Sequence, residues 1–87
     1  MISIKKLREN IEKIDTEIIK KLAKREKIVK QLGCLKACEG KRIVDLNREK
    51  KLMRIYESLS TTYQLSFPYI RRLFKIIINE SRKLQKS

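Results

Sequence analysis

The chain has 87 residues, of which 23 are Lys or Arg and 10 are Asp or Glu, so its formal net charge is +13. This length allows one domain over residues 1–87, and a chain this small buries only about two-thirds of its unfolded surface, so oligomerisation is an expected source of additional core. The charge favours anionic partners, namely nucleic acid, acidic lipid or a small polyanionic metabolite, and does not by itself choose among them.

The sequence carries no signal for membrane insertion, secretion or metal binding. No apolar run approaches the roughly 18 residues of a membrane span, and the first ten residues lack the apolar block of a signal peptide. His is absent, and Cys34 and Cys38 stand among scattered acids, so a zinc site would lack two ligands. We therefore expect a cytoplasmic protein with no metal, no cofactor, no membrane contact and two reduced thiols. Its Met1 and short ends lead us to expect a free-standing protein.

The longest predicted element is one amphipathic helix from Ile4 to Lys36, which neither Gly nor Pro interrupts before Gly33. At about 1.5 Å per residue it would be roughly 50 Å long, which is too long for the rest of the chain to cover. We therefore expect a two-fold partner to cover the exposed half, as in intertwined helical bundles. Its apolar residues recur at spacings of three and four: Ile4, Leu7, Ile11, Ile14, Ile18, Leu22, Val29 and Leu32.

Two shorter helices are predicted after a loop over residues 37–42. Asp45 is a suitable N-cap for the second helix, which we expect to end near Thr61 to Tyr63. Ser66 is a suitable N-cap for the third, because Pro68 then falls in the first turn, where its missing N–H is harmless. No strand is needed, so the predicted fold is all-α with three helices. The apolar stripes of these two helices contain Leu46, Leu52, Met53, Tyr56, Leu59 and Tyr63, then Ile70, Leu73, Phe74, Ile77, Ile78 and Leu84.

Each predicted helix also places polar side chains on its apolar face. At about 100° per residue, the projection puts these six there: Arg25 and Lys36 in the first helix, Arg48 and Glu49 in the second, Ser81 and Gln85 in the third. Buried charges are expensive unless they are paired or meet a ligand. A structural ion-pair network, for example Glu49 neutralising Arg25 or Lys36, is one reading. The inward cations outnumber the inward acid, so the other reading is a pocket between helices for an anion with about two negative charges.

The residues in these positions, taken together, resemble the all-helical (AroQ-type) chorismate mutase family. The similarity covers Leu7 to Gln85 without insertion or deletion, and the D-x-x-R-E and S-x-x-x-Q elements are specific in combination. The residues that carry it are Leu7, Arg8, Ile11, Ile14, Asp15, Ile18, Leu22, Arg25, Gly33, Lys36, Asp45, Leu46, Asn47, Arg48, Glu49, Phe74, Ile77, Ile78, Ser81 and Gln85.

The resemblance implies an intertwined homodimer that converts chorismate, a dianion, to prephenate on the route to phenylalanine and tyrosine. Carried over by position, Arg25 would bind one carboxylate, and Arg8 from the other subunit the second. Lys36 and Gln85 would donate to the ether oxygen. The resemblance also implies that Glu49, together with backbone near Asp45, would accept a hydrogen bond from the ring hydroxyl. Arg48 and Ser81 would complete the carboxylate-binding end of the site.

Three alternatives stay open at this point. A lyase on the same fold, isochorismate pyruvate lyase, would use a similar cationic pocket, although the full D-x-x-R-E favours the mutase. A basic helical nucleic-acid-binding protein would explain the charge, but not the inward direction of Arg25, Lys36 and Glu49, and it lacks stacking aromatics on a basic face. A structural or regulatory dimer without activity is the third, and the complete set of site residues argues against it. We accordingly expect no nucleic-acid partner.

Overall fold

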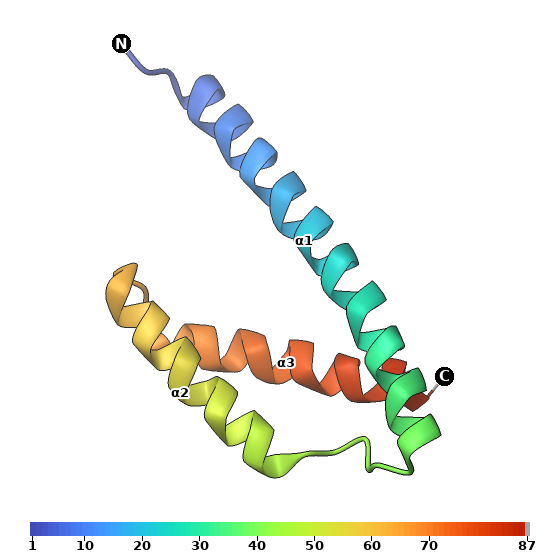
Figure 1. Cartoon of the computed structure of the whole chain (residues 1–87). Helices are drawn as coiled ribbons and strands as arrows, with labels where there is room; N and C mark the ends of the chain where they lie inside the picture. Colours follow the sequence, from blue (N-terminus) through green and yellow to red (C-terminus); the bar gives the residue numbers. More distant parts are fainter. Residues whose placement is uncertain (87) are drawn as a thin grey trace.

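The computed structural model describes residues 1–86 and contains three helices in this range, with no strand among them (Figure 1). They are α1 (Ile4–Glu39), α2 (Leu46–Thr62) and α3 (Phe67–Lys86). The all-α prediction is therefore confirmed. No helix in the described range is long and apolar enough to cross a membrane.

The long helix α1 runs for 36 residues between two well-formed caps. At its start the Ser3 side chain accepts a hydrogen bond from the backbone N–H of Lys6 at 3.0 Å. At its end Gly40 adopts the left-handed conformation with φ 66°, which favours glycine and closes the last turn. The predicted loop over residues 37–42 was thus wrong in its first half: the helix continues to Glu39, because no residue before Gly40 forces it to stop.

The two shorter helices begin and end close to the predicted positions. The Asp45 carboxylate caps α2 by accepting from the backbone N–H of Arg48 at 3.0 Å, and the helix ends at Thr62. Pro68 lies in the first turn of α3, where its lack of an N–H removes no helical hydrogen bond. The backbone N–H of Ile70 donates to the carbonyl of Ser66 at 3.1 Å and so marks the first turn.

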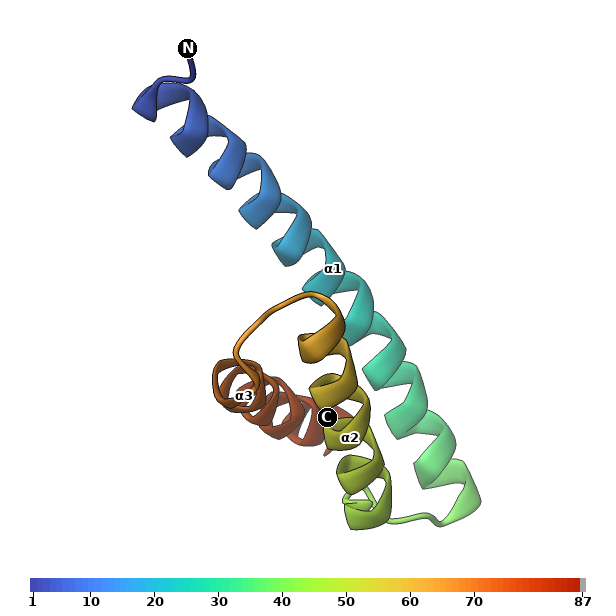
Figure 2. The same ribbon diagram turned by 90° about the vertical axis from the view of Figure 1, so that its left-hand side faces the viewer.

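Helix α3 is the central packing element, because it contacts both α2 and the C-terminal half of α1 (Figures 1 and 2). Val29 on α1 and Ile78 on α3 are 8% and 9% exposed and form the small apolar core. The rings of Tyr56 and Phe74 stack between α2 and α3 with their centroids 4.1 Å apart. Gly33 allows close approach of α1 and α3, since a Cβ there would lie 2.8 Å from the Cα of Gln85.

The N-terminal half of α1 projects beyond the other two helices, as Figure 2 shows, and gives the chain a longest dimension of 58 Å. The expectation that the chain cannot cover this helix by itself is confirmed. Apolar side chains that share one stripe of this segment are between 48% and 60% exposed; they are Leu7, Ile11, Ile14 and Ile18.

Candidate active site

A cavity of about 350 Å³ lies where the C-terminal half of α1 meets α2 and α3. Its apolar lining comes from the core residues and from the α2 stripe, including Val29, Ile78, Leu52 and Tyr56. Its polar lining contains all the inward residues predicted from the sequence together with Asp45 and a further residue, Arg82. Three helices that are far apart in the sequence thus place their polar side chains around one space.

The structure brings together all but one of the predicted site residues. Arg8 lies on the projecting half of α1, is exposed, and does not line the cavity. Its role in a partner's site stays a prediction. The predicted residues that line the cavity are Arg25, Lys36, Asp45, Arg48, Glu49, Ser81 and Gln85.

Arg25 is held by the buried hydroxyl of Ser81. The guanidinium Nη1 donates a hydrogen bond to Ser81 Oγ, and Ser81 Oγ donates in turn to the carbonyl oxygen of Ile77 at 2.8 Å. Ser81 is only 7% exposed, so its hydroxyl is fixed by the packing of α1 on α3. The guanidinium has five N–H donors, and this arrangement orients it while leaving donors for an anionic ligand.

Lys36 joins α1 to the α1–α2 loop and to α3. Its ammonium Nζ donates to the carbonyl oxygen of Ile43 at 2.8 Å, in the α1–α2 loop, and to Gln85 Oε1 at 2.7 Å, on α3. An ammonium has three donors, so one is left for a ligand. The Gln85 Nε2 donates to the carbonyl oxygen of Ser81 at 3.3 Å, which fixes the amide plane. Gly33 makes the Lys36–Gln85 contact possible by bringing α3 against α1.

Glu49 pairs with Arg82, which is not among the inward residues predicted from the sequence. Arg82 donates from Nε to Glu49 Oε2 at 2.9 Å and from Nη2 to Glu49 Oε1 at 2.5 Å. The suggested pairing of Glu49 with Arg25 or Lys36 is therefore wrong, because both cations are engaged with α3 instead. The hydrogen bond to Glu49 raises the pKa of Arg82 above its ordinary value, with desolvation acting in the opposite direction. A signal was available: Arg82 lies four residues after the buried Ile78, on the same helix face.

The charges around the cavity do not balance. The lining contains the cations Arg25, Lys36, Arg48 and Arg82 and the carboxylates of Asp45 and Glu49, which leaves two formal positive charges unmatched. Asp45 also serves as the N-cap of α2, which limits the freedom of its carboxylate. Such a site favours a dianion, and the nearby apolar side chains can contact the rest of that molecule.

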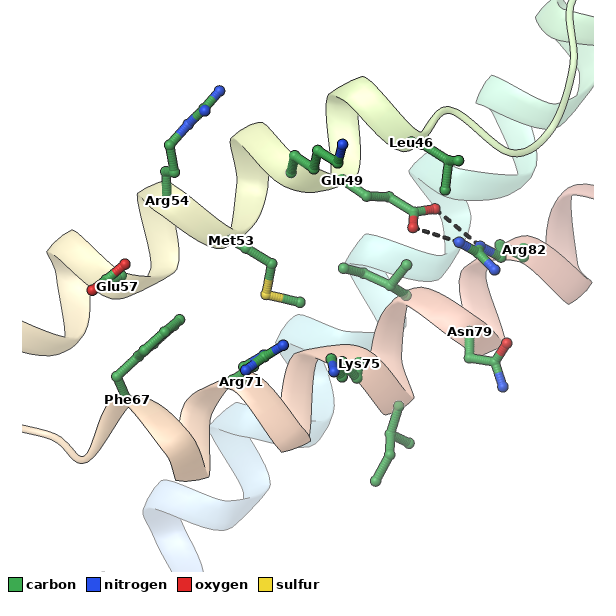
Figure 3. A pocket seen from close by; sticks show the side chains of 13 residues that line it. Leu46, Glu49, Met53, Arg54, Glu57, Phe67, Arg71, Lys75, Asn79 and Arg82 are labelled. Carbon is green, nitrogen blue, oxygen red and sulfur yellow. Dashed lines mark hydrogen bonds and ion pairs between the residues drawn. The ribbon is translucent and has the colours of Figure 1, made fainter.

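A second, larger cavity of about 870 Å³ lies on the opposite face of the α2–α3 layer (Figure 3). Figure 3 shows the Glu49 side chain reaching from α2 to Arg82 on α3, with both hydrogen bonds drawn as dashed lines. Glu49, Ile78 and Arg82 line both cavities. The Glu49–Arg82 ion pair is therefore part of the wall that separates the two spaces.

The fold and the cavity place the chain among small all-helical proteins with a cationic pocket between their helices. The chain belongs to the chorismate mutase type II family, whose model matches residues 7–86. The family resemblance seen in the sequence is thereby confirmed.

Two curated relatives of the chain are longer proteins. The chain is 38% identical over 79 residues to the bifunctional chorismate mutase/prephenate dehydratase of Buchnera aphidicola subsp. Acyrthosiphon pisum (strain APS). The aligned region covers 91% of this chain and 20% of that relative. It is 31% identical over 81 residues to the bifunctional chorismate mutase/prephenate dehydratase of Escherichia coli (strain K12). That aligned region covers 93% of this chain and 21% of the relative. The chain thus spans about a fifth of the length of these relatives.

Proposed function

We propose that this chain is a chorismate mutase, which isomerises chorismate to prephenate in the biosynthesis of phenylalanine and tyrosine. The observation that carries the proposal is the convergence of four cations and two carboxylates around one cavity, which leaves two positive charges unmatched. Chorismate is a dianion of matching charge. Membership of the chorismate mutase type II family supports the same conclusion.

The reaction suits a site that has donors but no nucleophile. One C–O bond breaks and one C–C bond forms within the same molecule, so no group is transferred to the protein. Catalysis then requires that the enolpyruvyl arm be held over the ring and that negative charge growing on the ether oxygen be stabilised. Lys36 and Gln85, already 2.7 Å apart, donate to that oxygen in this proposal, and Lys36 supplies the larger electrostatic contribution.

The other roles are those that the family resemblance implies, and the positions of the side chains around the cavity support them. Arg25, oriented by Ser81, binds one carboxylate, and Arg48 completes that end of the site. Glu49 accepts a hydrogen bond from the ring hydroxyl, near the backbone of Asp45. The assignment of each role is part of the proposal.

We further propose that the active form is a cytoplasmic homodimer, in which Arg8 of one chain binds the second carboxylate in the site of the other. The exposed apolar stripe of α1 supports this assembly, because an unpartnered face of this size would otherwise contact water. The exposure of Arg8 on the same projecting segment supports its role in a partner's site.

Product identification tests the proposed reaction. Purified protein is incubated with chorismate, and the products are separated by chromatography. Prephenate alone supports the mutase. Formation of pyruvate with a hydroxybenzoate would instead assign the lyase reaction to this pocket, and no product from a folded protein would reject both.

Subunit mixing tests the shared site. Arg8→Ala and Lys36→Ala should each be almost inactive, whereas a mixed dimer contains one site that lacks both side chains and one that is intact. Activity should therefore reappear after mixing under conditions where labelled subunits are shown to exchange. If exchange occurs and no activity returns, Arg8 does not act across the interface.

A further inference from the structure

Of the four cations that line the cavity, Arg82 is the one to which the proposed mechanism gives no part. It occupies the boundary between the two cavities and holds both oxygens of Glu49. The arrangement is drawn in Figure 3, where Arg82 approaches the carboxylate from α3 while Glu49 comes from α2. The Glu49–Arg82 ion pair is not needed to bind the substrate carboxylates, so it requires another explanation.

We propose that Arg82 is a positioning residue, which fixes the Glu49 carboxylate as a hydrogen-bond acceptor and so selects a substrate whose ring carries a free hydroxyl. The inference rests on the proposed function and extends it, because it assigns the specificity of the site for that hydroxyl to a pair of residues instead of to Glu49 alone.

The geometry of the pair supports a fixed orientation. Two parallel N–H···O bonds, at 2.9 and 2.5 Å, define the plane of the carboxylate as one bond could not. The side chains of Arg82 and Glu49 are 33% and 23% exposed, so the pair is partly shielded from water and from salt. A carboxylate has about four lone-pair positions, and Arg82 uses two of them. The remaining positions can accept a hydrogen bond from a hydroxyl, whereas an ether oxygen at the same place would meet only lone pairs.

The Arg82–Glu49 ion pair has a second effect on the site, because other cations lie close to it. Arg25 and Lys36 line the same cavity, and both must stay available for the substrate in the proposed mechanism. A Glu49 side chain without Arg82 would be free to rotate toward one of them and neutralise it. Arg82 therefore keeps the acceptor and the carboxylate-binding cations apart. Its loss should raise KM more than it lowers kcat, since the substrate would have to break a new ion pair before binding.

The test compares Arg82→Gln, Arg82→Lys, Glu49→Gln and the Arg82→Gln/Glu49→Gln double variant by steady-state kinetics. Lys83→Gln is the matched control, because Lys83 is the next residue on α3, is exposed, and only approaches Glu80 at 3.9 Å. We expect Arg82→Gln to lower kcat/KM about tenfold, mostly through KM. Arg82→Lys, which keeps the charge but not the two-bond geometry, should fall between it and the parent, and Lys83→Gln should match the parent.

Two readouts separate positioning from a purely structural role. In the Glu49→Gln background, Arg82→Gln should change kcat/KM less than twofold, because there is no carboxylate left to position. With a chorismate analogue whose ring hydroxyl is methylated, Arg82→Gln should have a smaller effect than with chorismate, because only the freed Glu49 pairing with a binding cation then opposes binding, and no hydroxyl contact is lost. If Arg82→Gln does not fold, Arg82→Lys provides the same two comparisons.

The outcomes distinguish this inference from the proposed function. A parent protein that does not form prephenate would reject the proposed function, and the inference with it. An active parent whose Arg82 variants are unchanged, or lose activity equally on both substrates and additively with Glu49→Gln, would overturn the inference and leave the mutase assignment intact. Higher activity in Arg82→Gln would also overturn it, because the pair would then hold Glu49 away from the substrate.

Discussion

Gly33→Ala adds a single methyl group at the point where α1 and α3 are closest, and it should affect activity as well as stability. The added Cβ would lie 2.8 Å from both the Cα and the carbonyl oxygen of Gln85, whereas ordinary contacts begin at 3.4 Å. Both neighbours are backbone atoms, so no side-chain rotation can relieve the overlap. Helix α3 must therefore move away from α1 by about 0.6 Å at this point.

The expected magnitude has two opposing parts. Overpacking of this kind costs about 1–3 kcal/mol, and a clash with backbone should be near the upper end. Replacing Gly by Ala within a helix recovers about 1 kcal/mol of helix propensity. The net loss in the free energy of unfolding should be about 2 kcal/mol. Because the displaced residue carries the amide that Lys36 contacts at 2.7 Å, a roughly tenfold fall in kcat/KM should accompany it.

Gly40→Ala is a matched control for this prediction. Gly40 has φ 66°, and a Cβ there would meet no atom within 4 Å, so the substitution strains the backbone at the end of α1 without pushing on α3. It should lower stability by about 1–2 kcal/mol and leave kcat/KM within about twofold. Both variants are compared with the parent at one protein concentration by denaturant unfolding and by chorismate turnover. Unchanged stability and turnover in Gly33→Ala would refute the close contact, and equal activity losses in both variants would refute its link to the site.

Three further substitutions or conditions test other parts of the account. Ser81→Ala removes the hydroxyl that orients Arg25, so KM for chorismate should rise about tenfold; an unchanged KM would mean that Arg25 is positioned without it. Asp45→Ala removes the N-cap of α2 and should lower the free energy of unfolding by about 1 kcal/mol, while Asp45→Ser should restore most of that loss; equal stability of the two variants would argue against the cap. Raising the salt concentration should lower kcat/KM several-fold, because a chain of charge +13 attracts a dianion over distances that salt screens; a flat profile would show that the net charge does not assist association.

Helical periodicity was sufficient to predict most of the architecture. The apolar stripes, the cap residue Asp45 and the position of Pro68 reflect local rules, and the structure follows them at both ends of α2 and at the start of α3. The same periodicity indicated which polar side chains point inward, so the residues of the cavity could be identified before their geometry was known. The end of α1 was placed too early because the loss of apolar periodicity after Leu35 does not itself end a helix; Gly40 does.

The partners of the inward residues could not be predicted in this way. Glu49 and Arg82 are 33 residues apart, and their contact depends on the angle and separation at which α2 crosses α3. Projection onto one helix gives the direction of each side chain, but it does not distinguish Arg82 from Arg25 or Lys36 as the partner of a carboxylate on another helix. The close approach at Gly33 is likewise a property of two helices together.

The most direct test of the central claim is chorismate turnover by the parent and by Lys36→Ala, both shown to be folded by circular dichroism and denaturant unfolding. Lys36 bonds to Ile43 and Gln85, so a small loss of stability is expected. Its proposed contribution to the transition state is larger, by analogy with the removal of an oxyanion donor, and corresponds to about 3 kcal/mol, or roughly a hundredfold in kcat. A folded Lys36→Ala with this loss of turnover would support the cavity as the site of catalysis. Parental turnover in the variant, or activity lost only in proportion to folded protein, would contradict it.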